Sequence, residues 1–151
     1  MTLAIRSFVT EHEQLDAAAV DAFLAAHQSP IVEGDAVTFL FRGEAGAVRL
    51  RHFIMGFPSL QPFRRIDGTD LWYLTMDVPR GSRIEYKLEV RRKRRTRLVL
   101  DPLNTHTARD PFGRNSVCYA SGYERREMAL SIHDGEAVTL RVEFEREPAA
   151  K

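Results

Sequence analysis

A run of cationic side chains, "RRKRRTR" at Arg91–Arg97, is the feature of the sequence best suited to binding chemistry. It places six positive charges in seven positions, a density typical of sites for nucleic acid, heparin or another polyanion. The net charge of the chain is only +1, so the remainder carries −5. A nucleic-acid-binding domain usually spreads its basic charge over a whole face. We therefore favour an exposed tip, with Arg94 and Arg95 as candidate contacts to an anionic ligand.

No serine or cysteine lies in a pattern that activates a nucleophile. A nucleophile elbow needs Gly-x-Ser-x-Gly on a turn from a strand to a helix. The segments "GFPSL" around Ser59 and "GRNSV" around Ser116 lack the second glycine. Cys118 is the only cysteine and lies in a predicted strand, where a lone cysteine is usually a small core residue. We expect no catalytic residue in this chain.

The histidines do not have the spacing of a metal site. None shows the helical i, i+4 spacing or the Cys/His clustering of a zinc site; they are His12, His27, His52, His106 and His133. His106 is the best candidate for a ligand contact, because it lies in the polar loop "DPLNTHTARDPFG". Such residues are also usual in a folded turn, the interpretation that we favour. "DGTD" lacks the later ligands of a calcium loop, so we expect neither a metal nor another cofactor.

The segment "TEHEQLDAAAVDAFLAAHQSP" at 10–30 predicts one amphipathic helix. Its apolar residues recur at helical spacing, at Leu15, Ala19, Val20, Phe23 and Leu24. Thr10 and Glu13 have the spacing of a capping box, and Pro30 ends the pattern. The helix must pack its apolar face on the domain that follows.

No segment resembles a signal peptide or reaches membrane-spanning length, so we expect a cytoplasmic location.

Short segments of strand character follow from residue 36 onward. They are rich in β-branched and aromatic residues and are separated by turn-like segments; they read "AVTFLFRG", "AVRLRHFI", "DLWYLTMDV", "RIEYKLEV", "TRLVL" and "AVTLRVEFE". Alternation places Trp72 and Leu74 on one face and Leu71 and Tyr73 on the other, which predicts a core position for Trp72. Together these strands predict a mainly β fold, a β-sandwich preceded by one helix. The basic run then becomes the loop at the tip of a β-hairpin.

Several motifs occur in a characteristic order along this predicted sandwich. They are "TFLFRG", "GTDLWYL", "VPRGSRIEYKLEV", "DPLN" and "PFGRNSV", within residues 30 to 123. In this order they resemble the N-terminal domain of the enterochelin esterase-like family. The resemblance implies an immunoglobulin-like sandwich of the early-set (E-set) class, similar to glycogen-binding modules of branching enzymes and the AMP-activated kinase β subunit. The resemblance divides the chain into a helical lead-in at 1–30, the sandwich at 31–123 and an extension at 124–151, whose one strand is predicted from the alternation of "AVTLRVEFE".

The resemblance to glycogen-binding modules implies where a ligand would bind. Lys87 and Asn115 lie where those modules place polar contacts to sugar, and Leu98 stands near the position of a stacking tryptophan. Phe57 or Phe63 is near the position of a second tryptophan. Because aromatic stacking supplies much of the affinity for sugar, we expect weak glycan binding or none.

In that family the domain precedes an α/β-hydrolase domain, for which the 28 or so residues after Tyr123 are too few. The leading hypothesis is a non-catalytic accessory domain that positions substrate or mediates assembly, partnered by a C-terminal hydrolase domain or a separate protein. A homo-oligomer is left open. The alternatives are a carbohydrate-binding module and a module that binds an anionic ligand or acidic partner through Arg91–Arg97. We expect no nucleic-acid partner and no membrane contact.

Overall fold

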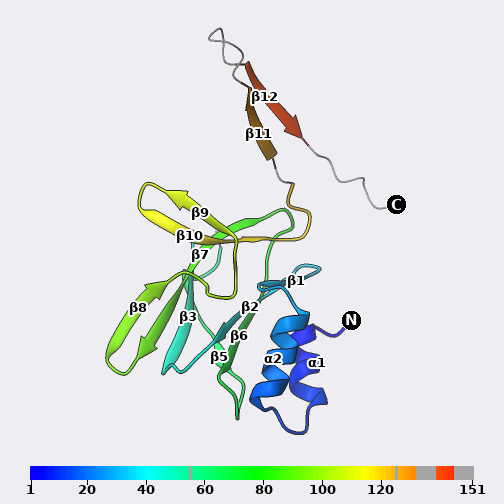
Figure 1. The fold of residues 1–151 in the computed structure, drawn as a ribbon, viewed down its shortest axis with the longest axis vertical. Helices are drawn as coiled ribbons and strands as arrows, with labels where there is room; N and C mark the ends of the chain where they lie inside the picture. The colour runs from blue at the N-terminus through cyan, green and yellow to red at the C-terminus, as the bar shows by residue number, and fades with distance from the viewer. Residues whose placement is uncertain (55, 125, 132–138, 145–151) are drawn as a thin grey trace.

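The fold is a sandwich of two antiparallel β-sheets with two helices on one side (Figure 1). The computed structural model describes residues 1–54, 56–124, 126–131 and 139–144, and for the last two ranges the backbone alone. One sheet has the order β1–β2–β6–β5, formed by Ile31–Glu33, Ala36–Arg42, Leu71–Asp77 and Arg64–Arg65. The other has the order β4–β3–β7–β10–β9, formed by Leu60–Pro62, Ala47–His52, Arg83–Arg92, Gly113–Tyr119 and Thr107–Asp110, and β8 (Arg95–Val99) also pairs with β7.

These two sheets confirm the predicted mainly β sandwich with helical structure before it. The immunoglobulin-like class and the boundaries at residues 30 and 123 stay predictions.

The core between the sheets follows from the period-2 pattern of the strands. The buried side chains that meet there include Val37, Phe39, Phe41, Leu50, Trp72, Tyr86 and Leu88. Trp72 is buried, and its Nε1 donates to the carbonyl of Gly43 at 3.1 Å. Leu74 packs with this cluster, while Leu71 and Tyr73 join the cluster on the other face of the same sheet. The predicted core position of Trp72 is confirmed.

Two helices, α1 at Ala4–Glu11 and α2 at Ala17–Ala26, stand where the sequence predicted one. Thr10 does not cap a helix, since its Oγ1 donates to the carbonyl of Arg6 at 2.9 Å inside α1. Asp16 caps α2 instead, because its Oδ1 accepts the N–H of Ala19 at 2.8 Å. The prediction of one helix over 10–30 was wrong because Asp16 is itself a strong N-cap and starts a second helix.

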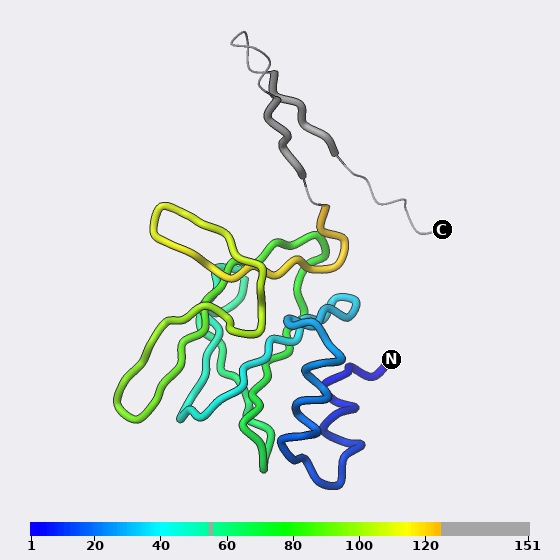
Figure 2. The backbone as a smooth tube through the Cα atoms, in the orientation of Figure 1, coloured from blue at the N-terminus to red at the C-terminus, as the bar shows by residue number. Residues whose placement is uncertain are grey.

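The two helices cover the outer face of the β1–β2–β6–β5 sheet. Figure 2 shows them side by side next to this sheet. Phe8 of α1 and Phe23 of α2 stack with ring centroids 4.4 Å apart, and they share a buried cluster with Leu40 and Leu71 of the sheet. The apolar face expected of the N-terminal segment therefore packs on the domain that follows, which makes the molecule three layers deep.

The basic run forms the end of a β-hairpin, as predicted. β7 ends at Arg92 and β8 begins at Arg95, so a two-residue turn joins them. Arg92 lies opposite Arg95 in the register, and Glu89 lies opposite Leu98. Most of the run is therefore paired strand, and only Lys93 and Arg94 form the turn, which corrects the prediction of a loop.

The last two described strands, β11 (Arg126–Ser131) and β12 (Thr139–Phe144), form an antiparallel pair. β12 confirms the strand predicted from "AVTLRVEFE". The extension predicted at 124–151 thus contains two strands and not one. His133 and the other residues at 125, 132–138 and 145–151 lie outside the described residues. Over the part of the chain that the structure describes, no helix is long and apolar enough to cross a membrane.

Candidate ligand-binding site

Three of the predicted ligand residues, Lys87, Leu98 and Asn115, line one hollow of about 320 Å³. Lys87 points away from the sandwich core, because its neighbours in β7, Tyr86 and Leu88, are buried in it. The hollow therefore lies on the outer face of the β4–β3–β7–β10–β9 sheet. Its lining consists of Arg51, Phe53, Glu85, Tyr86, Lys87, Leu98, Asp110, Phe112 and Asn115.

The strand register brings these residues together from distant parts of the sequence. Lys87 of β7 lies opposite Arg51 of β3. Leu98 of β8 pairs with the next outward-facing position of β7. β8 and β10 both pair with the edge of β7 that faces away from β3, and the register of β10 places Asn115 on the same face as Lys87. The site thus depends on three strand pairings at once.

Asp110 fixes the shape of the β9–β10 hairpin beside the hollow. Its Oδ1 accepts the N–H of Phe112 at 2.7 Å, and its Oδ2 accepts Nδ2 of Asn115 at 2.9 Å. Gly113 follows with a φ of 135°, a conformation that residues with a Cβ rarely adopt. The turn therefore orients the Asn115 amide and leaves Phe112 projecting from the tip.

Two exposed phenylalanines flank the hollow. The side chain of Phe53 is 85% exposed and that of Phe112 is 95% exposed. Leu98 of β8 is 46% exposed. Each ring offers a flat apolar face on which a sugar or an aromatic ligand can stack. Neither ring was predicted from the sequence, although an aromatic residue inside the turn "DPFG" was a usable signal. Phe57 and Phe63, considered instead, do not line the hollow, and Phe63 is buried in the core.

His52 positions Phe53 at the end of β3. Its Nδ1 accepts the N–H of Ile54 at 3.0 Å, which turns the chain after His52. β3 therefore ends at His52 instead of continuing through the predicted "AVRLRHFI". Burial lowers the pKa of His52 despite the opposing effect of the Pro58 carbonyl. The fold thus favours the neutral ring, the form that can accept this hydrogen bond.

The charges at the hollow are not all compensated. Glu85 accepts from Arg83 at 3.2 Å, and the Asp110 carboxylate is bound within its own hairpin. Among the described residues, Arg51 and Lys87 form no ion pair. The two free cations beside exposed rings suit a ligand with a flat apolar face and oxygen atoms that accept hydrogen bonds.

A buried polar network underlies the hollow. Tyr86 donates from its hydroxyl to Oδ2 of Asp101 at 2.6 Å, and Asn104 donates from Nδ2 to the Tyr86 oxygen at 3.0 Å. The N–H of Asp101 donates to Oγ of Ser116 at 2.8 Å. Burial raises the pKa of Asp101 and that of Tyr86. These bonds tie the polar segment that begins at Asp101 to the sheet, which supports its interpretation as a folded turn.

The described part of the chain shows no activated nucleophile. Burial, with a smaller contribution from Asp101, raises the pKa of Cys118 to about 12, so the thiol stays protonated near neutral pH. The Ser116 hydroxyl is buried and engaged with Asp101. In the same described residues no serine hydroxyl is hydrogen-bonded to a histidine. No cluster of three metal-ligating side chains occurs there either.

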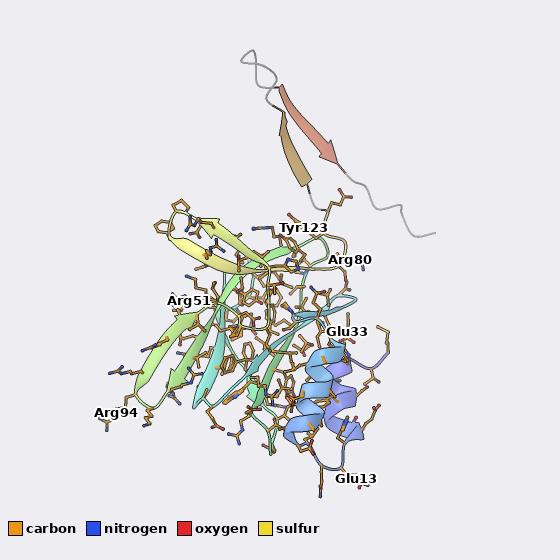
Figure 3. All side chains as sticks on the ribbon, viewed as in Figure 1. Glu13, Glu33, Arg51, Arg80, Arg94 and Tyr123 are labelled. Atoms are coloured by element: carbon orange, nitrogen blue, oxygen red, sulfur yellow. The ribbon has the colours of Figure 1, made fainter. Side chains whose placement is uncertain are left out.

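The other predicted ligand residues lie elsewhere. His106 lines a separate hollow of about 190 Å³ with Gln28, Ser29 and Tyr119, and its Nε2 is 3.5 Å from Nε2 of Gln28. Arg94 and Arg95 are exposed at the end of the β7–β8 hairpin and do not line the Lys87 hollow. Figure 3 shows Arg94 at this outer end, away from Arg51. The structure thus joins Lys87, Leu98 and Asn115 and separates the remaining three.

Two antiparallel sheets packed face to face, with helices on one outer face, define a β-sandwich domain. The sequence matches the family described as enterochelin esterase, N-terminal, over residues 36–135, and the chain belongs to this family. No curated protein sequence matches it.

Solved structures with this fold include two esterases. The ferric enterobactin esterase of Salmonella typhimurium is 19% identical with a TM-score of 0.57, covering 70% of this chain and 38% of the esterase. The enterobactin esterase of Shigella flexneri, solved in the presence of enterobactin, is 15% identical with a TM-score of 0.57, covering 72% of this chain and 41% of the esterase. The matched region is thus about two fifths of the length of those esterases.

Proposed function

We propose that this chain acts as a non-catalytic accessory domain beside an α/β-hydrolase domain of the enterochelin esterase type, where it positions substrate. The observation that carries the proposal is the hollow itself, where exposed rings and uncompensated cations gather in the absence of any activated nucleophile among the described residues. Membership of the enterochelin esterase N-terminal family supports the same role. A role in assembly with the hydrolase domain is compatible with it.

The chemistry of the hollow supports a substrate of the enterobactin class. The Shigella flexneri relative was solved in the presence of enterobactin. Phe53 and Phe112 supply stacking faces, and Lys87 and Arg51 supply cations for electron-rich oxygen atoms. In this arrangement the hydrolase domain supplies the nucleophile and the present chain holds part of the substrate.

Two measurements on the chain test the proposal. The chain should not hydrolyse p-nitrophenyl esters, and calorimetry should detect enterobactin binding that weakens at least about tenfold in Phe112→Ala. Val9→Ala is the matched control, because Val9 is an exposed apolar residue on α1, far from the hollow in sequence and fold. Robust ester turnover abolished by replacing one serine or Cys118 would overturn the non-catalytic assignment. Enterobactin binding equal in Phe112→Ala and wild type would overturn the site.

Carbohydrate binding at the same hollow is the second candidate function. The specific observation in its favour is that Lys87 and Asn115 converge there, with Phe53 and Phe112 as stacking faces in place of tryptophans. Retardation in glycogen-containing gels, lost in Phe112→Ala, would support it. Unchanged mobility of the wild-type chain in glycogen, together with no response to β-cyclodextrin, would argue against it.

A further inference from the structure

The β7–β8 hairpin carries a concentrated charge that the rest of the fold does not compensate. All positions from Arg91 to Leu98 are exposed, and six of them are cations. Among the described residues, Arg42, Arg49, Arg80 and Arg83 each pair with a carboxylate, whereas no cation of the run does. Arg92 is held by another bond, from its Nε to the carbonyl of Glu44 at 2.8 Å, which leaves its charge uncompensated.

Some residues of the hairpin are also not the types that would make it most stable. Lys93 occupies the first turn position with a φ of 54°, where glycine, asparagine or aspartate is preferred. Arg92 and Arg95 lie directly opposite each other, and like charges in such cross-strand pairs are destabilising. Glycine at position 93 would relieve the first cost, and a neutral residue at position 95 would relieve the second. Local departures of this kind, without a compensating contact in the chain, are typical of functional surfaces.

Protection of the β8 edge from aggregation explains only part of this charge. The charges that discourage pairing with another chain are those on the edge strand itself. The run instead places cations on both strands and in the turn, and Figure 3 shows Arg94 at the end of the hairpin, projecting away from the sandwich.

We propose that the Arg91–Arg97 hairpin is a docking surface for an acidic patch on a protein partner. Arginine guanidinium groups bind carboxylates in bidentate fashion, and a compact group of them fits a compact group of Asp or Glu side chains. Leu98, 46% exposed at the base of the hairpin, adds an apolar contact next to the charges, a composition typical of protein interfaces. A long polyanion fits less well, because the remainder of the chain carries −5 and would repel it.

This surface shares only Leu98 with the Lys87 hollow, and the proposal goes beyond the accessory role in substrate binding. None of the cations in the run lines the hollow. The docking surface could therefore be correct if substrate positioning is wrong, and the reverse also holds.

The test measures binding of a fluorescein-labelled oligoglutamate peptide to the whole chain by anisotropy at low and high salt. The hairpin variant carries Arg94→Gln, Arg95→Thr and Arg97→Thr, which remove three charges and relieve the Arg92–Arg95 opposition. The matched control carries Arg6→Gln, Arg64→Gln and Arg65→Gln, which remove the same charge from exposed positions on α1 and β5. Unfolding by urea shows that each variant is folded before its binding is compared.

The wild-type chain and the control should bind the peptide with affinity that falls as salt rises, and the hairpin variant should bind at least about tenfold more weakly. Equal loss in the control and the hairpin variant would mean that net charge alone governs binding, which overturns the proposal. Absence of peptide binding at low salt overturns it as well. Stronger binding of a single-stranded oligonucleotide of equal charge would overturn the assignment to a protein partner. A hairpin variant that binds the peptide normally but self-associates would show that the cations only prevent the β8 edge from pairing with another chain. That result would also overturn the proposal.

Discussion

The hydroxyl of Tyr86 donates a 2.6 Å hydrogen bond to the carboxylate of Asp101, and both groups are buried. Tyr86 is a central residue of β7 and also lines the candidate hollow, whereas Asp101 begins the segment that leads to β9. This one bond therefore joins the sheet that carries Lys87 to the chain that positions the β9–β10 hairpin. The shape of the hollow depends on a polar contact made beneath it.

Tyr86→Phe should destabilise the fold by about 1–3 kcal/mol, because it leaves the buried Asp101 carboxylate and the Asn104 amide without their shared partner. Urea denaturation followed by the fluorescence of Trp72 measures the change. Tyr73→Phe is the matched control, since Tyr73 is half-buried and belongs to the cluster under the helices. Equal loss of unfolding free energy in the two variants would show that the hydrogen bonds of Tyr86 to Asp101 and Asn104 do not stabilise the fold more than an ordinary tyrosine hydroxyl does.

The stability of the fold should fall as the pH drops below the ordinary range of histidine. The pKa of His52 is lower in the folded chain than in the unfolded chain, so the unfolded state binds the proton first. The stability contributed by neutral His52 is complete above about pH 6.5 and is lost as the pH falls through the folded pKa. Protonation also removes the Nδ1 acceptor that holds the Ile54 N–H and positions Phe53.

His52→Asn isolates this effect, because the asparagine oxygen can still accept the Ile54 N–H and does not titrate. The free energy of unfolding should depend less on pH between about 7 and 5 in this variant than in the wild-type chain, even if the smaller side chain lowers stability at every pH. Identical pH profiles for the two chains would contradict the role given to His52.

Asp16→Ala should cost about 1 kcal/mol of stability, because it removes the side-chain acceptor of the first turn of α2. Thr10→Ala should cost less, since Thr10 bonds back to the Arg6 carbonyl within α1 and caps nothing. Thermal unfolding compares the two variants directly. A larger loss in Thr10→Ala than in Asp16→Ala would favour a single helix beginning at Thr10.

Cys118 should resist thiol reagents in the folded chain. It is 2% exposed, and burial raises its pKa to about 12, so access and thiolate content are both low near neutral pH. Reaction with Ellman's reagent should be slow without denaturant and fast in concentrated urea. Fast labelling of the folded chain, at the rate of the unfolded one, would contradict the buried position of Cys118.

Much of the fold could be predicted because the strands carry their own pattern. The alternation of Leu71, Trp72, Tyr73 and Leu74 assigned each side chain to the correct face of β6, since that sheet is covered on both faces by separate apolar clusters. The N-terminal segment was harder. Two N-cap signals, Thr10 and Asp16, stand six residues apart. Asp16 caps α2, whereas Thr10 lies inside α1, and the rings of Phe8 and Phe23 stack between the two helices.

The mainly β class, the hairpin position of the basic run and the family to which the motifs point could be predicted from the sequence, because they follow from local periodicity and motif order. It also identified Lys87, Leu98 and Asn115 as candidates, through the resemblance. The folded chain was needed to show that these three meet at one hollow while His106 and Arg94 lie elsewhere. The exposure of Phe53 and Phe112 was likewise a tertiary result, because it depends on a turn after His52 and on the Asp110 carboxylate. Strand register and long-range hydrogen bonds join residues that are far apart in the chain, and no local pattern encodes them.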